Sequence, residues 1–259
     1  MIAAILLLAQ AQTYKTEKAI PYRTESVQTA TIRQRCKLDI YYPVGKKDFS
    51  TVIWFHGGGL TGGDRDIPKD LMDQGIAVIA PSYRLSPADK APSYIEDAAA
   101  ATAWTFNNIS KYGGSTKNIF VSGHSAGGYL ASMITLDKRW LAKYKIDPDQ
   151  FAGLIPFSGQ AITHYTIRAE RGIKDTTAVI DDLAPLNHVR NDCPPVLLLT
   201  ADRNKELLGR YEEVAYFWRM FQLVKHPDCQ ILEMQGYDHG GMPYPGFPIM
   251  VGWMNKHRR

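Results

Sequence analysis

The chain has 259 residues, 45% of them hydrophobic and 22% charged, so it can bury a sizeable core and is not expected to be disordered. Its formal net charge of +4 comes from 30 basic and 26 acidic residues that are scattered along the sequence. No basic run is long enough to follow a phosphate backbone, which argues against nucleic acid as a partner.

The N-terminal stretch, residues 1–11, is apolar and ends in Ala9-Gln10-Ala11. Signal peptidase accepts small residues in this pattern, so we predict a signal peptide over residues 1–11 and a secreted or periplasmic protein. A stretch of about eight or nine apolar residues is too short to cross a bilayer core of about 30 Å, and no stable membrane span is expected. No repeat or linker divides residues 12–259, which predicts a single domain.

Short β-rich runs then alternate with helical patterns along the chain. Strands are expected at residues 37–42, 51–55, 76–80, 118–122, 151–157, 195–200 and 230–234. Helices are expected at residues 68–74, 94–112, 126–135, 207–224 and 249–256. This alternation predicts an α/β fold with a doubly wound, mainly parallel sheet and helices on both faces. Ligands of such sheets bind beyond the carboxyl ends of the strands, so the chemistry is expected in the loops that follow them.

The second expected strand ends in a glycine-rich loop, His-Gly-Gly-Gly at residues 56–59. Glycines allow backbone N–H groups to approach a substrate oxygen, as the developing negative charge of a tetrahedral intermediate requires. We predict an oxyanion hole formed by the N–H groups of Gly57, Gly58 and Ala126. A phosphate-binding loop would end in Gly-Lys-Ser or Gly-Lys-Thr, which this loop does not.

A strand, a Gly-x-Ser-x-Gly turn and a helical pattern follow one another around Ser125. This succession is typical of a nucleophile elbow, in which the serine adopts a strained backbone conformation. Gly123 and Gly127 leave room where the strand and the helix cross. We therefore predict that Ser125 is a nucleophile.

A serine nucleophile needs a base, and the base needs a third group that holds its tautomer. His239 lies in a glycine-rich loop after the last expected strand and is predicted to be the base, with His164 and His188 as weaker alternatives. Asp202 follows the penultimate strand, and the order serine, acid, histidine then agrees with that of α/β-hydrolases. Asp202 is therefore predicted to be the acid, with Glu206 as the nearest alternative.

Substrate contacts are expected from two segments. Residues 160–191 form a candidate lid or substrate wall that contains Tyr165, and Met242 and Tyr244 are candidates for the acyl side of the site. The predicted chemistry requires no metal and no organic cofactor.

The three cysteines, Cys36, Cys193 and Cys229, are too few for a disulfide-built scaffold, and none has the spacing of a zinc ligand. Cys193 and Cys229 each precede an expected strand. If these strands are neighbours, a disulfide between the two cysteines is within reach and would be consistent with export. Two buried free thiols are an equally open interpretation.

The sequence resembles the hormone-sensitive-lipase-like branch of the α/β-hydrolases, and within it small bacterial carboxylesterases, some of which act on acetylated or feruloylated plant polysaccharides. The resemblance runs from about residue 39 to residue 253. It rests on the loop at 56–59, the Ser-Tyr-Arg-Leu-Ser-Pro stretch at 82–87, the elbow at 123–128 and Asp-His-Gly at 238–240. It implies a cofactor-free serine esterase that acts on short-acyl esters of small molecules or carbohydrates, and structural roles for Tyr83, Arg84 and Asp97.

Two other functions stay open. Amidases of the kynurenine-formamidase-like type share the His-Gly-Gly loop and the elbow, but usually have Trp where this chain has Leu60. A non-catalytic binding module on the same fold would be expected to lack the serine or the histidine, and this chain has both. The sequence does not indicate an oligomeric state.

Overall fold

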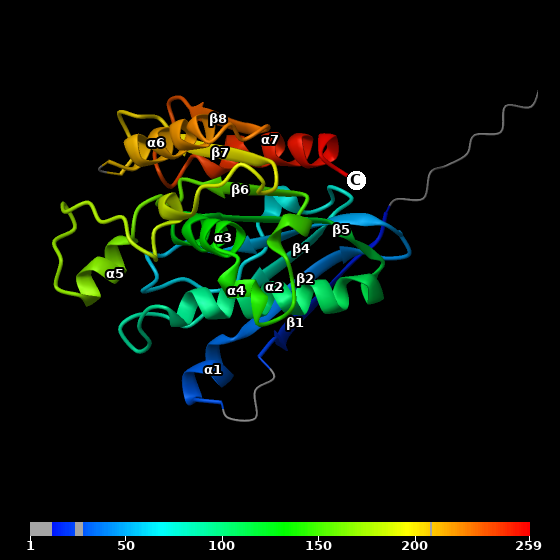
Figure 1. The fold of residues 1–259 in the computed structure, drawn as a ribbon. Helices are drawn as coiled ribbons and strands as arrows, with labels where there is room; N and C mark the ends of the chain where they lie inside the picture. The colour runs from blue at the N-terminus through cyan, green and yellow to red at the C-terminus, as the bar shows by residue number, and fades with distance from the viewer. Residues whose placement is uncertain (1–11, 24–27, 208) are drawn as a thin grey trace, which may run out of the picture.

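The computed structural model describes residues 12–23, 28–207 and 209–259. Its centre is an eight-stranded sheet in the order β1-β2-β4-β3-β5-β6-β7-β8 (Figure 1). β2 runs antiparallel to β1 and β4, and the other neighbouring strands are parallel, which confirms the predicted mainly parallel α/β sheet. The strands are β1 Tyr14–Pro21, β2 Lys37–Pro43, β3 Phe49–Phe55, β4 Ala77–Pro81, β5 Gly114–His124, β6 Gly153–Phe157, β7 Val196–Ala201 and β8 Cys229–Met234.

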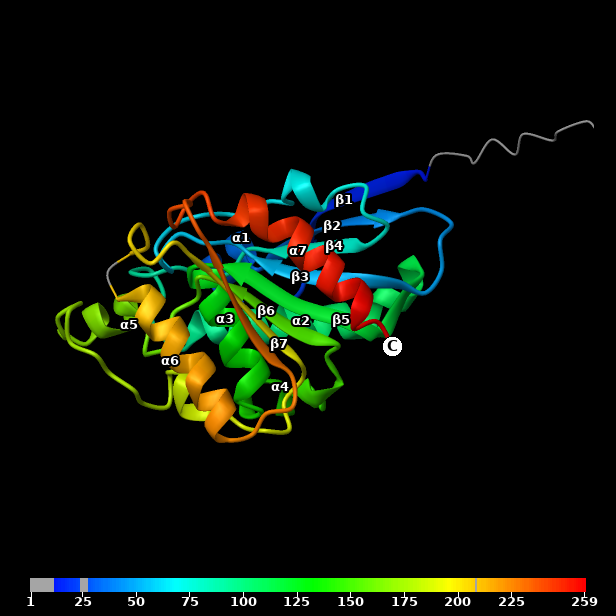
Figure 2. The same cartoon turned by 90° about the horizontal axis from the view of Figure 1, so that it is seen from above.

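Helices cover both faces of this sheet (Figure 2). The helices are α1 Ala30–Arg35, α2 Ser93–Tyr112, α3 Ala126–Leu136, α4 Arg139–Ala142, α5 Tyr165–Glu170, α6 Arg210–Leu223 and α7 Pro243–Lys256. α2, α3 and α6 contribute to the core on one face, and α7 contributes to the core on the other. Because both faces are covered, β3, β4, β6 and β7 are buried along their whole length, which explains their continuous apolar sequences.

Three local expectations need correction. The helix expected at residues 68–74 is a single 3-10 turn, Lys69–Leu71, because Asp73 and Gly75 adopt positive φ angles of 60° and 73° and end the helical path. β1 was not expected, since it is a largely exposed edge strand without apolar alternation. α7 begins at Pro243, earlier than expected, with proline in its first turn, where no N–H partner is required.

The three cysteines are free thiols, so the hypothesis of a bridge between Cys193 and Cys229 is wrong for this structure. The register of the last two strands explains this result. Cys229 is paired with Val196 across β7 and β8, while Cys193 lies further back along the chain, before β7 begins.

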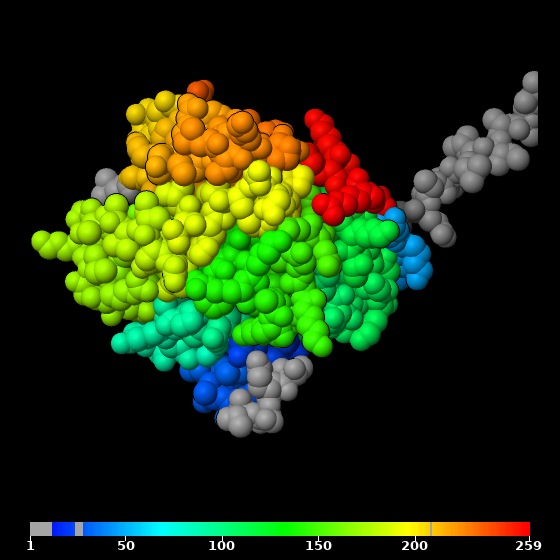
Figure 3. All heavy atoms as spheres, in the orientation of Figure 1, coloured from blue at the N-terminus to red at the C-terminus, as the bar shows by residue number. Residues whose placement is uncertain are grey.

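The predicted signal peptide, residues 1–11, lies outside the described residues. Among the helices that the structure does describe, none combines the length and apolar character needed to cross a membrane. The candidate lid, residues 160–191, contains α5 and forms the left-hand end of the face shown in Figure 3, in yellow-green.

Candidate active site

Ser125 lies at the junction of β5 and α3, with a φ of 55° and a ψ of −116°. Such a conformation is costly for a residue with a Cβ, and it persists only where the surrounding structure enforces it. Here the backbone N–H of Ser125 donates a hydrogen bond to the carbonyl oxygen of Phe157, at the end of β6, over 2.8 Å. The serine is 7% exposed, so the predicted strained elbow is present and opens narrowly to solvent.

The two glycines of the elbow are required by the close approach of β3. A Cβ atom on Gly127 would lie 2.0 Å from the carbonyl oxygen of Phe55, and a Cβ on Gly123 would lie 2.6 Å from the same oxygen. Real Cβ atoms do not approach backbone this closely, so any side chain would push β3 away from the elbow. The Gly-x-Ser-x-Gly spacing is thus a packing requirement of this crossing.

The glycine-rich loop after β3 lies directly against the elbow. A Cβ atom on Gly57 would lie 3.5 Å from the Cβ of Ser125. Gly58 has a φ of 107°, which favours glycine. Within the part of the chain that the structure describes, the backbone N–H groups of Gly57, Gly58 and Ala126 have no hydrogen-bond acceptor. Three donors near Ser125 are therefore left available.

His56, at the start of this loop, fixes its shape. Its Nδ1 donates to the carbonyl oxygen of Gly57 over 2.7 Å, and its ring stacks on Tyr83 with the ring centroids 4.2 Å apart. The hydroxyl of Tyr83 in turn donates to the carbonyl oxygen of His56 over 2.7 Å. Burial lowers the pKa of His56 to about 4, so the ring is neutral at physiological pH.

His239 is brought to the elbow by the loop that follows β8. The Nε2 atom of His124, the residue before Ser125, donates to the carbonyl oxygen of His239 over 2.8 Å, and the two imidazole rings lie 4.7 Å apart. Burial and the neighbouring His239 lower the pKa of His124 to about 4. A neutral His124 adds no positive charge beside the second imidazole.

The alternative histidines have other partners. His164 is fully buried and accepts a hydrogen bond from the backbone N–H of Thr166 at the start of α5. His188 donates to the carbonyl oxygen of Asp182 over 3.0 Å. Both contacts are structural, and they leave His239 as the histidine that contacts the elbow.

The carboxylate bound to His239 is that of Glu206. The Nδ1 atom of His239 donates to Oε1 of Glu206 over 2.6 Å, and the Glu206 side chain is 1% exposed. Burial raises the pKa of Glu206, but the hydrogen bonds from His239 and from the hydroxyl of Ser158 outweigh it, and the resulting pKa is about 2. The Glu206 carboxylate is therefore ionised at neutral pH and offers His239 a negatively charged partner.

Asp202 does not contact His239, which corrects the prediction that it is the acid. Its Oδ2 accepts from the backbone N–H of Gly236 over 2.7 Å, and its Oδ1 accepts from that of Asn204 over 2.9 Å. Its own N–H donates to the carbonyl oxygen of Tyr237 over 3.0 Å. Asp202 thus ties the loop after β7 to the loop after β8.

A tight turn after β7 explains why Glu206, and not Asp202, contacts His239. The carbonyl oxygen of Asp202 accepts hydrogen bonds from the N–H groups of both Lys205 and Glu206, each over 2.8 Å. Glu206 lies at the end of this turn, and its side chain, 1% exposed, reaches Nδ1 of His239. The sequence signal was limited to the position of Glu206 after β7.

Among the predicted substrate-binding residues, Tyr165 is the one placed at the glycine-rich loop. A Cβ on Gly59 would lie 2.0 Å from the hydroxyl oxygen of Tyr165, and the hydroxyl of Thr166 donates to the carbonyl oxygen of Gly59. Met242 is fully buried in the core beneath α7, so the prediction that it lines the site is wrong. Tyr244 is 66% exposed in the first turn of α7.

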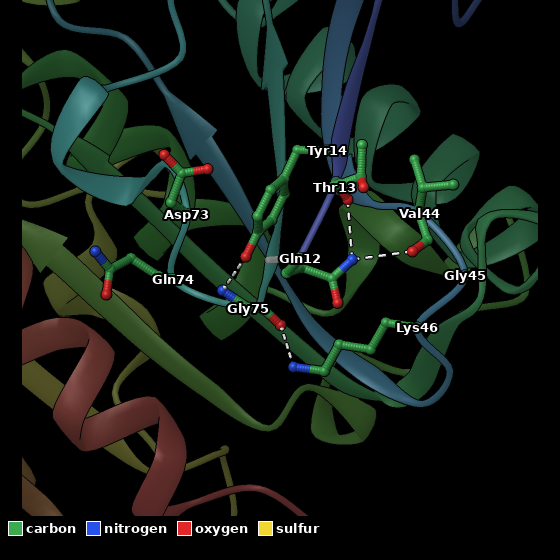
Figure 4. Close-up of a pocket in the computed structure, with 9 residues that line it drawn as sticks. All are labelled: Gln12, Thr13, Tyr14, Val44, Gly45, Lys46, Asp73, Gln74 and Gly75. Carbon is green, nitrogen blue, oxygen red and sulfur yellow. Dashed lines mark hydrogen bonds between the residues drawn. The ribbon is translucent and has the colours of Figure 1, made fainter. Parts of the chain in front are cut away.

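A hollow of about 730 Å³ lies elsewhere on the molecule (Figure 4). It is lined by residues 12–14, 44–46 and 73–75, which lie near the amino ends of β3 and β4. Lys46 and Tyr14 hydrogen-bond to the backbone of Gly75 there. Ser125 follows the carboxyl end of β5, so this hollow is separate from the elbow. Within the described residues, no group of His, Cys, Asp and Glu side chains is arranged to hold a metal ion.

Several known esterases are similar to this chain. The BD-FAE family model matches residues 38–152, a range that includes the glycine-rich loop and the elbow. The carboxylic ester hydrolase LipN of Mycobacterium tuberculosis is 35% identical over 114 residues, which cover 42% of this chain and 30% of LipN. Esterase LipC of the same organism is 25% identical over 205 residues, which cover 72% of this chain and 50% of LipC. The chain thus matches half or less of the length of these relatives.

Solved structures match nearly the whole chain. A truncated carbohydrate esterase from gut microbiota has a TM-score of 0.75 at 17% identity, covering 96% of this chain and 98% of that one. An inhibited form of esterase B from Lactobacillus rhamnosis has a TM-score of 0.71 at 20% identity, covering 94% of this chain and 87% of that one. At such identities the likeness concerns the fold.

Proposed function

We propose that this chain, an α/β-hydrolase similar to the hormone-sensitive-lipase-like esterases, is a serine-dependent carboxylic ester hydrolase. One observation carries the proposal: the buried, ionised carboxylate of Glu206 accepts a 2.6 Å hydrogen bond from Nδ1 of His239, on a loop that contacts the elbow. A histidine held through Nδ1 keeps Nε2 free to take a proton. The serine, the base and the orienting acid are then Ser125, His239 and Glu206.

The proposed reaction is acyl transfer in two halves. The hydroxyl oxygen of Ser125 attacks the ester carbonyl carbon while Nε2 of His239 takes the hydroxyl proton. The imidazolium is stabilised by Glu206, and it then protonates the leaving alcohol. In the second half, water attacks the acyl carbon while Nε2 of His239 takes a proton from the water. The bond between the acyl carbon and the Ser125 oxygen then breaks, the imidazolium returns its proton to that oxygen, and the acid leaves.

The glycine-rich loop supports the charged intermediate. As the carbonyl oxygen becomes negative, it accepts hydrogen bonds from the N–H groups of Gly57, Gly58 and Ala126. These groups have no acceptor within the described residues, so they need not break an existing bond to serve. Removal of one such donor in hydrolases typically costs about 100- to 1000-fold in kcat.

We propose short-acyl esters of small or carbohydrate alcohols as substrates. An exposed side chain, that of Tyr165, stands beside the glycine-rich loop. Tyrosines combine an apolar ring with a polar hydroxyl, which suits an alcohol that is both bulky and polar. The carbohydrate esterase named above shares the fold and supports this choice.

Hydrolysis of p-nitrophenyl esters, from acetate to palmitate, tests the proposal directly. We expect turnover to be highest with acetate or butyrate and to fall by about 10⁶-fold in Ser125→Ala. Ser132→Ala is the matched control, because its hydroxyl is also buried but donates to the carbonyl oxygen of Gly128 within α3. An inert wild type, or a Ser125→Ala variant as active as the wild type, would reject the esterase assignment.

Two further assays separate the competing functions. Hydrolysis of N-formylkynurenine in preference to acetylated sugars would indicate the amidase. Failure of a serine-directed fluorophosphonate probe to label the protein would indicate a binding module. Export stays a proposal as well, and it predicts that the mature protein recovered from the periplasm or medium begins at Gln12.

A further inference from the structure

Ser158 is a buried residue that the proposed reaction does not use. It follows β6, its side chain is fully buried, and its φ is 45°. A positive φ is unfavourable for a residue with a Cβ and would suit glycine. The chain holds the residue there through its N–H, which donates to the carbonyl oxygen of Leu199 over 2.7 Å. Because the fold maintains a serine in this strained and buried position, the serine hydroxyl is a candidate for a functional role.

The hydroxyl of Ser158 reaches Glu206. Its Oγ lies 2.5 Å from Oε2 of the carboxylate. The backbone N–H of Ala201 points to both oxygens, at 3.3 Å from each. Because this N–H occupies a lone pair of the Ser158 hydroxyl, the hydroxyl proton is directed to the carboxylate.

Each oxygen of the Glu206 carboxylate therefore has two donors. Oε1 accepts from His239 over 2.6 Å and from the N–H of Leu207 over 2.7 Å. Oε2 accepts from Ser158 and from the N–H of Ala201. A glutamate has one more rotatable bond than an aspartate and loses more rotamer freedom when it is fixed, so its plane needs contacts on both oxygens. Among the residues that the structure describes, Ser158 is the one side chain besides that of His239 that donates to this carboxylate.

Ser158 is itself fixed from the opposite side. The guanidinium of Arg210 donates to the carbonyl oxygen of Ser158. Arg210 is 3% exposed and lies on the first turn of α6, the helix that follows Glu206. The hydroxyl of Ser158 is thus held at the end of β6 by one strand contact and one helix contact.

We propose that Ser158 is a positioning residue, whose hydroxyl fixes the Glu206 carboxylate in the plane in which it binds His239. This inference rests on the proposed function, since it assigns Ser158 a role in the same site. Ser158 contacts neither the substrate nor the reacting atoms and acts through Glu206.

Two substitutions separate the hydroxyl from the backbone strain. Ser158→Gly removes the hydroxyl and relieves the positive φ, whereas Ser158→Ala removes the hydroxyl and keeps the strain. If the hydroxyl matters, both variants lose about tenfold or more in kcat for p-nitrophenyl butyrate, with KM nearly unchanged. The control Ser132→Ala loses a buried hydroxyl elsewhere and is expected to keep its kcat.

A second readout does not depend on turnover. The proton on Nδ1 of His239 is followed by NMR at the downfield end of the proton spectrum. We expect this resonance to shift or broaden in Ser158→Gly and Ser158→Ala and to be unchanged in Ser132→Ala. Thermal unfolding of all variants establishes that each is folded at the assay temperature.

The outcomes are distinguishable. Wild-type kcat and an unchanged resonance in Ser158→Gly would overturn the role of Ser158, even if Ser158→Ala were impaired, because strain would then explain the loss. A wild type that hydrolyses no ester would reject the proposed function. The resonance would still report on Ser158, and its insensitivity to both substitutions would overturn the positioning role as well.

Discussion

Replacement of Glu206 by glutamine is the sharpest test of the site. The variant keeps the size of the side chain but removes a charge that is 1% exposed and 2.6 Å from Nδ1 of His239. The amide also places a donor where the carboxylate accepted hydrogen bonds from two sides. Loss of the equivalent carboxylate in serine hydrolases lowers kcat by about 10⁴-fold, or roughly 5 kcal/mol of transition-state stabilisation. We expect a loss of about 10³- to 10⁴-fold for Glu206→Gln.

Asp202→Asn is the matched control, because it removes a carboxylate from the same loop. Within the described part of the chain, the donors to the Asp202 side chain are two backbone N–H groups, and an asparagine oxygen can still accept one of these bonds. We expect its kcat with p-nitrophenyl acetate to fall by less than about tenfold, the effect of losing one exposed loop contact. Near wild-type activity in Glu206→Gln, with a loss of about 10³-fold in Asp202→Asn, would refute the assignment of Glu206.

Three further predictions concern stability. The pKa of Glu206 is lowered to about 2, so its ionised form stabilises the folded state above its usual pKa near 4.5, by about 3 kcal/mol. This contribution is lost as the pH falls from about 4.5 to 2, and urea titrations over that range are expected to show a steeper fall for the wild type than for Glu206→Gln. Gly127→Ala would place a Cβ 2.0 Å from a carbonyl oxygen of β3 and is expected to destabilise the folded state by about 3 kcal/mol or more. Its control is Gly252→Ala, in open space on α7, which is expected to stabilise the folded state by up to about 1 kcal/mol. Thermal melts compare the two variants, and equal stability would contradict the packing argument. Asp97→Asn weakens a buried carboxylate that accepts two hydrogen bonds from the Arg84 guanidinium and one from Arg23, and it is expected to cost about 3–5 kcal/mol in denaturant unfolding. A loss below about 1 kcal/mol would contradict this expectation.

Much of the fold follows from local sequence. The apolar runs predicted the seven strands from β2 to β8, and the mainly parallel sheet and the resemblance to hormone-sensitive-lipase-like esterases are confirmed. The elbow is predictable because its requirements lie within five consecutive residues: a strained serine and two glycines that a neighbouring strand approaches closely. Motifs of this kind report a backbone conformation that local chemistry selects.

The identity of the acid depended on tertiary structure. Asp202 and Glu206 both follow β7, and the order of residues along the chain does not distinguish them. The turn at Asp202, the docking of the loop after β8 and the hydroxyl of Ser158 at the end of β6 together place Glu206 beside His239. These contacts join residues far apart in sequence: Glu206 and His239 are separated by 33 positions, and Ser158 and Glu206 by 48.

The same reason explains the other corrections. Met242 is apolar and near His239 in sequence, but the start of α7 turns it into the core. Cys193 precedes β7 and Cys229 begins the neighbouring strand β8, but the register of the two strands pairs Cys229 with Val196 and not with Cys193. Sequence by itself determined which segments form strands, helices and the strained turn, because those preferences are local. Which side chains meet at the ends of the strands was decided by strand register and loop docking, which are set by packing across the whole sheet.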